Sequence, residues 1–116
     1  MAIGSLRGVI RFDWDPDKAI ENEWQHGVSF DEAETAVNHP LSRTVPDLEH
    51  SSTEDRWRTI GWSDLDRILV VITSDREPRP RIISAWRATK RERRELEEHP
   101  PSLAGRGRHP ARYEQS

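Results

Sequence analysis

The sequence predicts an α+β domain in which helices pack on a small antiparallel sheet. Three observations support this: two capped helical segments lie early in the chain, three strand-like runs follow in its second half, and a charged helix comes last. The expected order is β-α-α-β-β-β-α. We expect a flexible leader at 1–8, one domain at 9–98 and a disordered tail at 99–116, which is rich in glycine, proline and polar residues.

The beginning of the chain, up to Gly27, predicts one strand and one helix. Residues 9–12 have the apolar, β-branched character of a strand. The helix begins after Asp15, a residue that caps helix N-termini, with Pro16 in the first helical position. It ends at Gly27, which suits a left-handed cap. The side chains expected to face the core are Ala19, Ile20 and Trp24.

A second helix is predicted directly after the first. Ser29 and Glu32 have the spacing of a capping box. The helix stops before Pro40, and 41–45 is expected to be a short extended segment. Its buried stripe consists of Phe30, Ala33 and Val37.

Three strands are then predicted at 56–62, 67–73 and 81–86. In the first, Arg56, Arg58 and Ile60 alternate with uncharged residues, so one face of the sheet is expected to be basic. The run at 68–72 is apolar on both sides, which indicates a central strand.

The stretch from Ala85 onward changes to long charged side chains that favour a helix. Its basic residues precede its acidic ones, against the preference of the helix dipole. The pattern fits either a solvated helix face or a surface for a polyanion or a partner. The basic residues expected to share one face are Arg87, Lys90, Arg91 and Arg94.

Composition excludes several classes of protein. The 116-residue chain has no cysteine, so it has neither disulfides nor thiolate chemistry. It has neither a long apolar run nor a signal-peptide pattern, so we expect a cytoplasmic protein with no membrane contact. The net charge is −3, but the stretch 76–94 holds eight basic residues and two acids. This local excess makes nucleic-acid binding plausible.

The residues fit RNA phosphodiester chemistry better than other reactions. The five histidines show no metal-ligand spacing, and neither a nucleophile-elbow motif nor a phosphate-binding glycine loop is present, so we expect no metal and no cofactor. Cleavage through the ribose 2′-hydroxyl needs only a proton acceptor, a proton donor and cations that stabilise the phosphorane charge. Arginine matches phosphate oxygens, and aromatic rings stack on bases.

Each candidate also has a structural interpretation. Arg58 and Arg81 fit cross-strand pairing with acids as well as phosphate binding. The helical spacing of Trp24 favours the core over a ligand platform. Trp57 and Trp86 fit both ordinary strand packing and base stacking. His26 lies at a helix end, where a histidine commonly contacts terminal carbonyls, although imidazole also suits proton transfer.

Fragments of one motif series run through 12–97 in a fixed order. They are Phe12-Asp13-Trp14-Asp15 with Lys18 and Asn22, His26-Gly27-Val28-Ser29-Phe30 with Glu32-Ala33, Asp47 with His50-Ser51, Arg56 with Ile60-Gly61, Arg67 with Leu69-Val70-Val71, and Arg81-Ile82-Ile83-Ser84-Ala85 with Ala88-Thr89-Lys90-Arg91-Glu92-Arg93. In this order and spacing the chain resembles the BrnT family, toxins of type II toxin–antitoxin modules.

The resemblance implies a RelE-like fold, ribonuclease activity that arrests translation, and neutralisation by a BrnA-like antitoxin. It also implies a hetero-oligomer with the antitoxin, whose ribbon-helix-helix part binds operator DNA. Two positions depart from the family. Trp86 stands where an arginine is usual, and Leu96 stands where a tyrosine is common. The first departure is expected to weaken cleavage, and the second to alter antitoxin contact or helix packing.

The leading hypothesis is a metal-independent endoribonuclease toxin, and the alternative is a non-catalytic antitoxin partner that tunes operon autoregulation. The expected catalytic residues are His26, His50, Glu54, Arg56, Arg67, Arg76 and Arg81. The expected RNA-binding residues are Trp57, Arg58, Trp86, Arg87 and Lys90. The expected antitoxin-binding residues are Arg91, Arg94 and Leu96.

Overall fold

The computed structural model describes residues 9–47, 49 and 55–98. The expected leader at 1–8 and tail at 99–116 lie outside these residues. The elements are α2 (Pro16–His26), α3 (Phe30–Val37), β1 (Arg43–Pro46), β2 (Arg56–Trp62), β3 (Ile68–Ser74), β4 (Arg81–Arg87) and α4 (Lys90–Glu98). Within the described ranges, no helix has the length and apolar character needed to cross a membrane.

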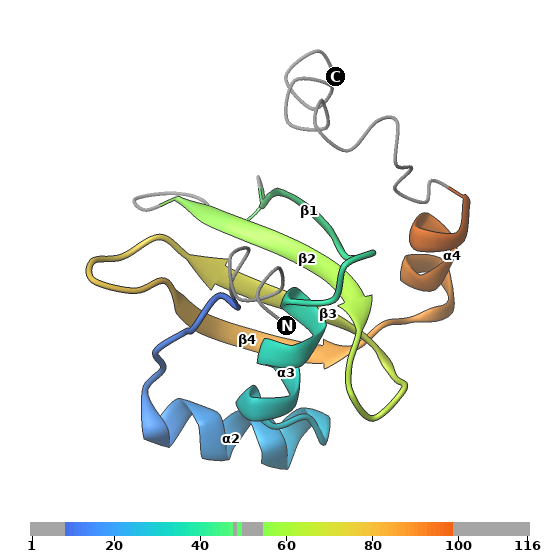
Figure 1. Cartoon of the computed structure of the whole chain (residues 1–116). Helices are drawn as coiled ribbons and strands as arrows, with labels where there is room; N and C mark the ends of the chain where they lie inside the picture. The colour runs from blue at the N-terminus through green and yellow to red at the C-terminus, as the bar shows by residue number, and fades with distance from the viewer. Residues whose placement is uncertain (1–8, 48, 50–54, 99–116) are drawn as a thin grey trace.

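The four strands form one antiparallel sheet in the order β1-β2-β3-β4. Helices α2 and α3 cover one face of this sheet, and α4 lies at the far end of β4 (Figure 1). The predicted α+β class is confirmed, and the two early helices lie in their predicted places.

Side chains of the central strand alternate between two hydrophobic clusters. Leu69 and Val71 belong to the larger cluster, which α2 and α3 cover. Val70 belongs to the smaller cluster, together with Ile60 and with Leu96 from α4. Both clusters therefore depend on β3, as the apolar run at 68–72 predicted.

The predicted helix caps are confirmed. The Asp15 side chain accepts a hydrogen bond from the Asp17 N–H at 2.9 Å. Gly27 has a φ of 68°, in the left-handed region. The Ser29 hydroxyl accepts from the Glu32 N–H at 3.0 Å.

The prediction that Ile20 and Trp24 face the core is wrong: these side chains are 62% and 85% exposed. The buried side of α2 is set instead by Asn22. Its amide donates to the Ala85 carbonyl at 2.8 Å, and its carbonyl oxygen accepts from the Ala85 N–H at 3.1 Å. The helix therefore binds the edge strand β4 through a polar side chain, which a count of apolar positions does not detect.

The expected strand at 9–12 does not form. Side chains of α3 bind this extended backbone instead. The Asn38 side chain accepts from the Ile10 N–H at 2.7 Å, and the Glu34 carboxylate accepts from the Phe12 N–H at 2.8 Å. Only Asp13 pairs with the sheet, as an isolated parallel bridge to Arg81.

The strand-to-helix change lies later than predicted. β4 continues to Arg87, and the N–H of the next residue still donates to the Ile68 carbonyl at 2.9 Å. Helix α4 starts after Thr89, which forms a capping box with Glu92 at distances of 2.9 and 3.1 Å. Arg87 is therefore a strand residue and does not share the face of α4.

Helix α3 packs very closely against β2 at Gly61. A Cβ atom at this position would lie 2.6 Å from the Ala36 carbonyl oxygen and 2.7 Å from the Ser42 Cβ. Only glycine allows this approach without a shift of α3.

We predict that Gly61→Ala lowers the free energy of unfolding by about 3 kcal/mol, the cost of forcing an extra methyl into a packed contact. Gly27→Ala is the matched control: nothing lies within 4 Å of its added Cβ, so only the left-handed φ costs energy, about 1 kcal/mol. Urea unfolding of both variants measures the difference. A larger loss for Gly27→Ala would contradict the packing argument.

Candidate functional site

One face of the sheet carries a row of polar residues that cross-strand pairing brings together. Arg56 of β2 pairs with Ser74 of β3, and Ser74 pairs with Arg81 of β4. We call these three residues the arginine row. They lie on the face away from α2 and α3. Arg58 and Ile72 form the next pair on the same side, and the pair after that, Ile60 and Val70, belongs to the smaller cluster that α4 covers.

The arginine row holds polar atoms without partners. The Ser74 hydroxyl is fully buried, and neither it nor the buried Nε of Arg81 has a hydrogen-bond partner among the described residues. Arg56 lies on the other side of the serine. Buried polar atoms are nearly always satisfied, so two neighbouring unsatisfied donors point to a ligand with acceptor oxygens.

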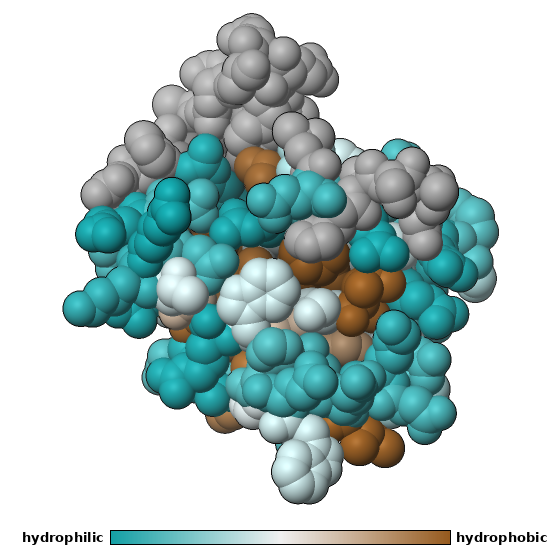
Figure 2. All heavy atoms as spheres, turned by 180° about the vertical axis from the view of Figure 1, so that it is seen from behind, coloured by the Kyte–Doolittle hydropathy of each residue, from teal (hydrophilic) through white to brown (hydrophobic). Residues whose placement is uncertain are grey.

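A hollow of about 600 Å³ lies beside this row, between the sheet and α4. Trp86 and Ile72 contribute apolar surface to it, and Arg58 lies between them and α4. Figure 2 shows the molecule from behind, with pale and brown side chains gathered in the middle of a hydrophilic surface. The full lining is Pro46, Asp47, Glu49, Arg58, Ile72, Trp86, Thr89, Arg91, Glu92 and Glu95.

Glu92 organises the α4 side of the hollow. It accepts hydrogen bonds from the Thr89 N–H at 2.9 Å, the Trp86 indole at 3.2 Å and Arg58 at 3.3 Å. Burial raises the pKa of Glu92, but its contacts with Thr89, Trp86 and Arg58 outweigh burial and lower it below the usual value. Glu92 is therefore a poor proton acceptor at neutral pH and acts as an anchor for Trp86 and Arg58.

Arg58 is held by α4 on two sides. Its guanidinium lies 3.3 Å from Glu92 and 3.2 Å from Glu95. Of the two interpretations from the sequence, pairing with acids is therefore present. These acids belong to α4 rather than to a neighbouring strand.

Of the three candidates for proton transfer, the structure describes only His26. His26 is exposed at the end of α2, and its ring centroid lies 6.3 Å from that of Trp86, but it does not line the hollow. His50 and Glu54 lie outside the described residues. Among those described, no group of three histidine or acidic side chains is placed to hold a metal ion.

The other predicted residues are dispersed. Trp57 lies on the opposite sheet face, paired with Thr73, and its indole donates to Asp75 at 3.1 Å. Arg76 is exposed between β3 and β4, and Arg87 is exposed at the end of β4. On α4, Lys90, Arg91 and Arg94 are exposed, whereas Leu96 is 1% exposed in the smaller core. Leu96, predicted to bind the antitoxin, thus packs α4 onto the sheet.

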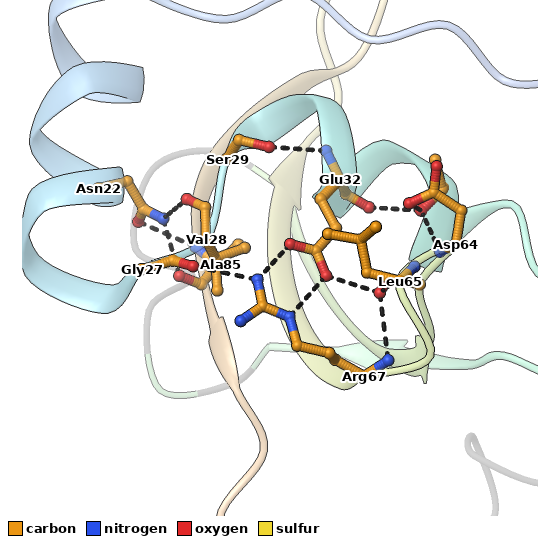
Figure 3. Close-up of polar contacts among 11 residues, drawn as sticks. Asn22, Gly27, Val28, Ser29, Glu32, Asp64, Leu65, Arg67 and Ala85 are labelled. Atoms are coloured by element: carbon orange, nitrogen blue, oxygen red, sulfur yellow. Dashed lines mark hydrogen bonds and ion pairs between the residues drawn. The ribbon is translucent and has the colours of Figure 1, made fainter.

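Arg67 lies away from the arginine row, where its half-buried guanidinium forms an ion pair with the buried Glu32 (Figure 3). Its Nε donates to the carboxylate at 2.9 Å, and its Nη2 contacts both the other carboxylate oxygen and the Gly27 carbonyl. The Ser63 hydroxyl also donates to Glu32, at 2.6 Å. The Arg67 hydrogen bonds lower the pKa of Glu32, burial opposes them, and Ser63 adds to the lowering.

Sequence reasoning missed Ser74 and the anchoring role of Glu92. The capping-box spacing from Thr89 to Glu92 was a usable signal for the second. Nothing local marks Ser74, because its place between two arginines results from strand register.

Comparison with known families identifies the family of this chain. A family model described as "Ribonuclease toxin, BrnT, of type II toxin-antitoxin system" matches residues 14–92, more than half of the chain. The chain belongs to the BrnT family. The match spans the elements from α2 to the first turn of α4, and thus the arginine row and most of the hollow. No curated protein matches the chain. BrnT proteins are ribonuclease toxins of type II systems, so the family implies an antitoxin partner.

We predict that Glu32→Gln lowers the free energy of unfolding at pH 7 by about 2 kcal/mol, the usual size of a hydrogen bond to a charged group. Because the folded-state pKa is lowered, the charge of Glu32 stabilises the fold above the unfolded pKa of about 4.3 and ceases to do so as pH falls through the folded value. Urea unfolding at pH 7 and pH 3 should therefore show a difference from wild type that narrows in acid. The exposed Glu21→Gln serves as control, and a difference that persists at pH 3 would contradict the role of the charge.

Proposed function

We propose that this BrnT-family chain is an endoribonuclease that cleaves RNA without a metal ion and thereby inhibits translation. The observation that carries the proposal is the arginine row, in which a buried serine hydroxyl and a buried arginine Nε have no hydrogen-bond partner in the described part of the chain. A scissile phosphate would supply the missing acceptors, and arginine forks stabilise the additional charge of the phosphorane.

In the proposed reaction the ribose 2′-oxygen attacks the adjacent phosphorus while its proton passes to a base. The bond from phosphorus to the 5′-oxygen breaks, and this oxygen takes up a proton. The products are a 2′,3′-cyclic phosphate and a 5′-hydroxyl end. The candidates for proton transfer remain His26, His50 and Glu54. The position of His26 beside Trp86 supports its inclusion.

The hollow beside the row suits an unstacked base. The Trp86 ring contributes to its lining, and the hydrogen bond from its indole to Glu92 restricts its orientation. Stacking of a base on such a ring contributes about 1–3 kcal/mol. In this proposal Arg76, Arg87 and Lys90 attract the RNA backbone, whereas Arg67 positions the hairpin between β2 and β3.

We further propose that a ribbon-helix-helix antitoxin neutralises the toxin in the cytoplasm, forms a hetero-oligomer with it and carries the complex to operator DNA. Arg91 and Arg94 are exposed on α4 and available for contact with the antitoxin.

We predict that Arg81→Ala and Ser74→Ala lower the cleavage rate of purified protein by about 100-fold and 10-fold, because they remove a charged and a neutral phosphate contact respectively. Gel analysis of labelled RNA, with EDTA present, measures the rates. Lys18→Ala removes an equal charge from the opposite side of the molecule and serves as control. Equal effects of all three variants, or loss of wild-type cleavage in EDTA, would contradict the proposed site.

The alternative function, a non-catalytic antitoxin partner, is favoured by the engagement of Trp86 with Glu92 at a position where the family usually has an arginine. If Trp86 costs activity, Trp86→Arg should raise the cleavage rate about tenfold, because it adds a cation to the lining of the hollow. Trp86→Phe, which keeps an aromatic ring, serves as control. An absence of cleavage by both wild type and Trp86→Arg, with folding intact, would favour the alternative.

A further inference from the structure

The outer face of α2 exposes large apolar side chains in a regular pattern. Ile20 and Trp24 are four residues apart, on the same side of the helix, and are 62% and 85% exposed. A shallow hollow of about 450 Å³ is lined by these two residues and Glu23. We call Ile20 and Trp24 the α2 ridge. At the lower end of the molecule, the end at which α2 lies in Figure 1, pale and brown side chains project into solvent in Figure 2.

The α2 ridge contributes little to the fold. Helix α2 binds the sheet through Asn22, and Ala19 packs against the larger core cluster, so the opposite side of the helix is free. Of the large apolar side chains found exposed in the described part of the chain, Trp24 is the most exposed. Tryptophan is strongly enriched among the residues that dominate protein–protein binding energy. An exposed tryptophan without a structural task therefore points to a partner protein.

The charges around the ridge indicate which kind of partner it would bind. Asp17, Glu21 and Glu23 are exposed on α2, and Lys18 is the single lysine or arginine of the helix. Phosphate groups would be repelled, which disfavours RNA on this surface. A symmetric contact with a second copy would bring like charges together, which disfavours self-association. A basic protein segment with an apolar anchor fits both the ridge and its acidic border.

We propose that the α2 ridge docks the antitoxin, through a basic segment whose apolar side chain sits on Ile20 and Trp24. The inference rests on the proposed pairing with an antitoxin and adds a surface separate from Arg91 and Arg94 on α4. Because the larger core cluster, which α2 covers, and the arginine row lie on opposite faces of the sheet, docking on α2 leaves the proposed RNA site open. Neutralisation would then need a second contact, such as the one proposed for α4.

The test is a binding titration between the full-length chain and the antitoxin of its own module, by calorimetry. Trp24→Ser is expected to weaken binding at least about thirtyfold, the threshold of a hot-spot residue. Ile20→Ser and Glu23→Lys are expected to weaken it about tenfold. Leu65→Ser is the matched control, because Leu65 is also 62% exposed but lies between β2 and β3. Urea midpoints close to wild type would show that the ridge variants remain folded.

The outcomes separate the two proposals. Weakened antitoxin binding by the ridge variants, with Leu65→Ser unchanged and RNA cleavage retained, supports the α2 docking site. Wild-type affinity in Trp24→Ser, with binding lost in Arg91→Glu/Arg94→Glu, overturns it and places the antitoxin on α4 alone. Wild-type protein that binds the antitoxin through the ridge but leaves RNA intact overturns the nuclease proposal while the docking site stands. Failure of the wild-type protein to bind the antitoxin overturns the docking site.

Discussion

The ion pair between Glu32 and Arg67 is the interaction on which the arrangement of the layers depends. It joins α3 to the hairpin between β2 and β3, and through the Gly27 carbonyl it also joins the turn between α2 and α3. The buried charge of Glu32 needs this partner, because removal of Arg67 leaves the carboxylate without compensation. The pair therefore holds both helices to one face of the sheet and leaves the other face to the arginine row.

Strand alternation then divides the chemistry of the molecule. Residues that point toward α2 and α3 build the larger core, whereas Arg56, Ser74 and Arg81 point to the other side. The acidic α2 and the basic sheet face end up on different sides of the protein. A polyanion and a basic protein partner would thus have separate surfaces, which suits a toxin that needs both a substrate and an antitoxin.

Helix α4 covers part of the sheet face that carries the arginine row, and its side chains hold residues of that face in place. The capping box of Thr89 and Glu92 starts the helix where it also binds Trp86 and Arg58. Glu92, one of four acids in α4, therefore anchors both Trp86 and Arg58 on the α4 side of the hollow. The indole N–H of the half-buried Trp86 thus has an acceptor in Glu92.

Sequence alone determined the features that depend on neighbouring residues: the caps at Asp15, Gly27 and Ser29, the central apolar strand, and the basic side of β2. The motif series also led to the family, which the match over residues 14–92 shows. Tertiary structure decided which side of α2 is buried, because Asn22 satisfies the edge of β4 at Ala85, far away in sequence. It also decided that Ser74 lies between two arginines and that Arg67 pairs with Glu32. Both contacts join residues distant in the chain, and strand register and helix packing, rather than local spacing, bring them together.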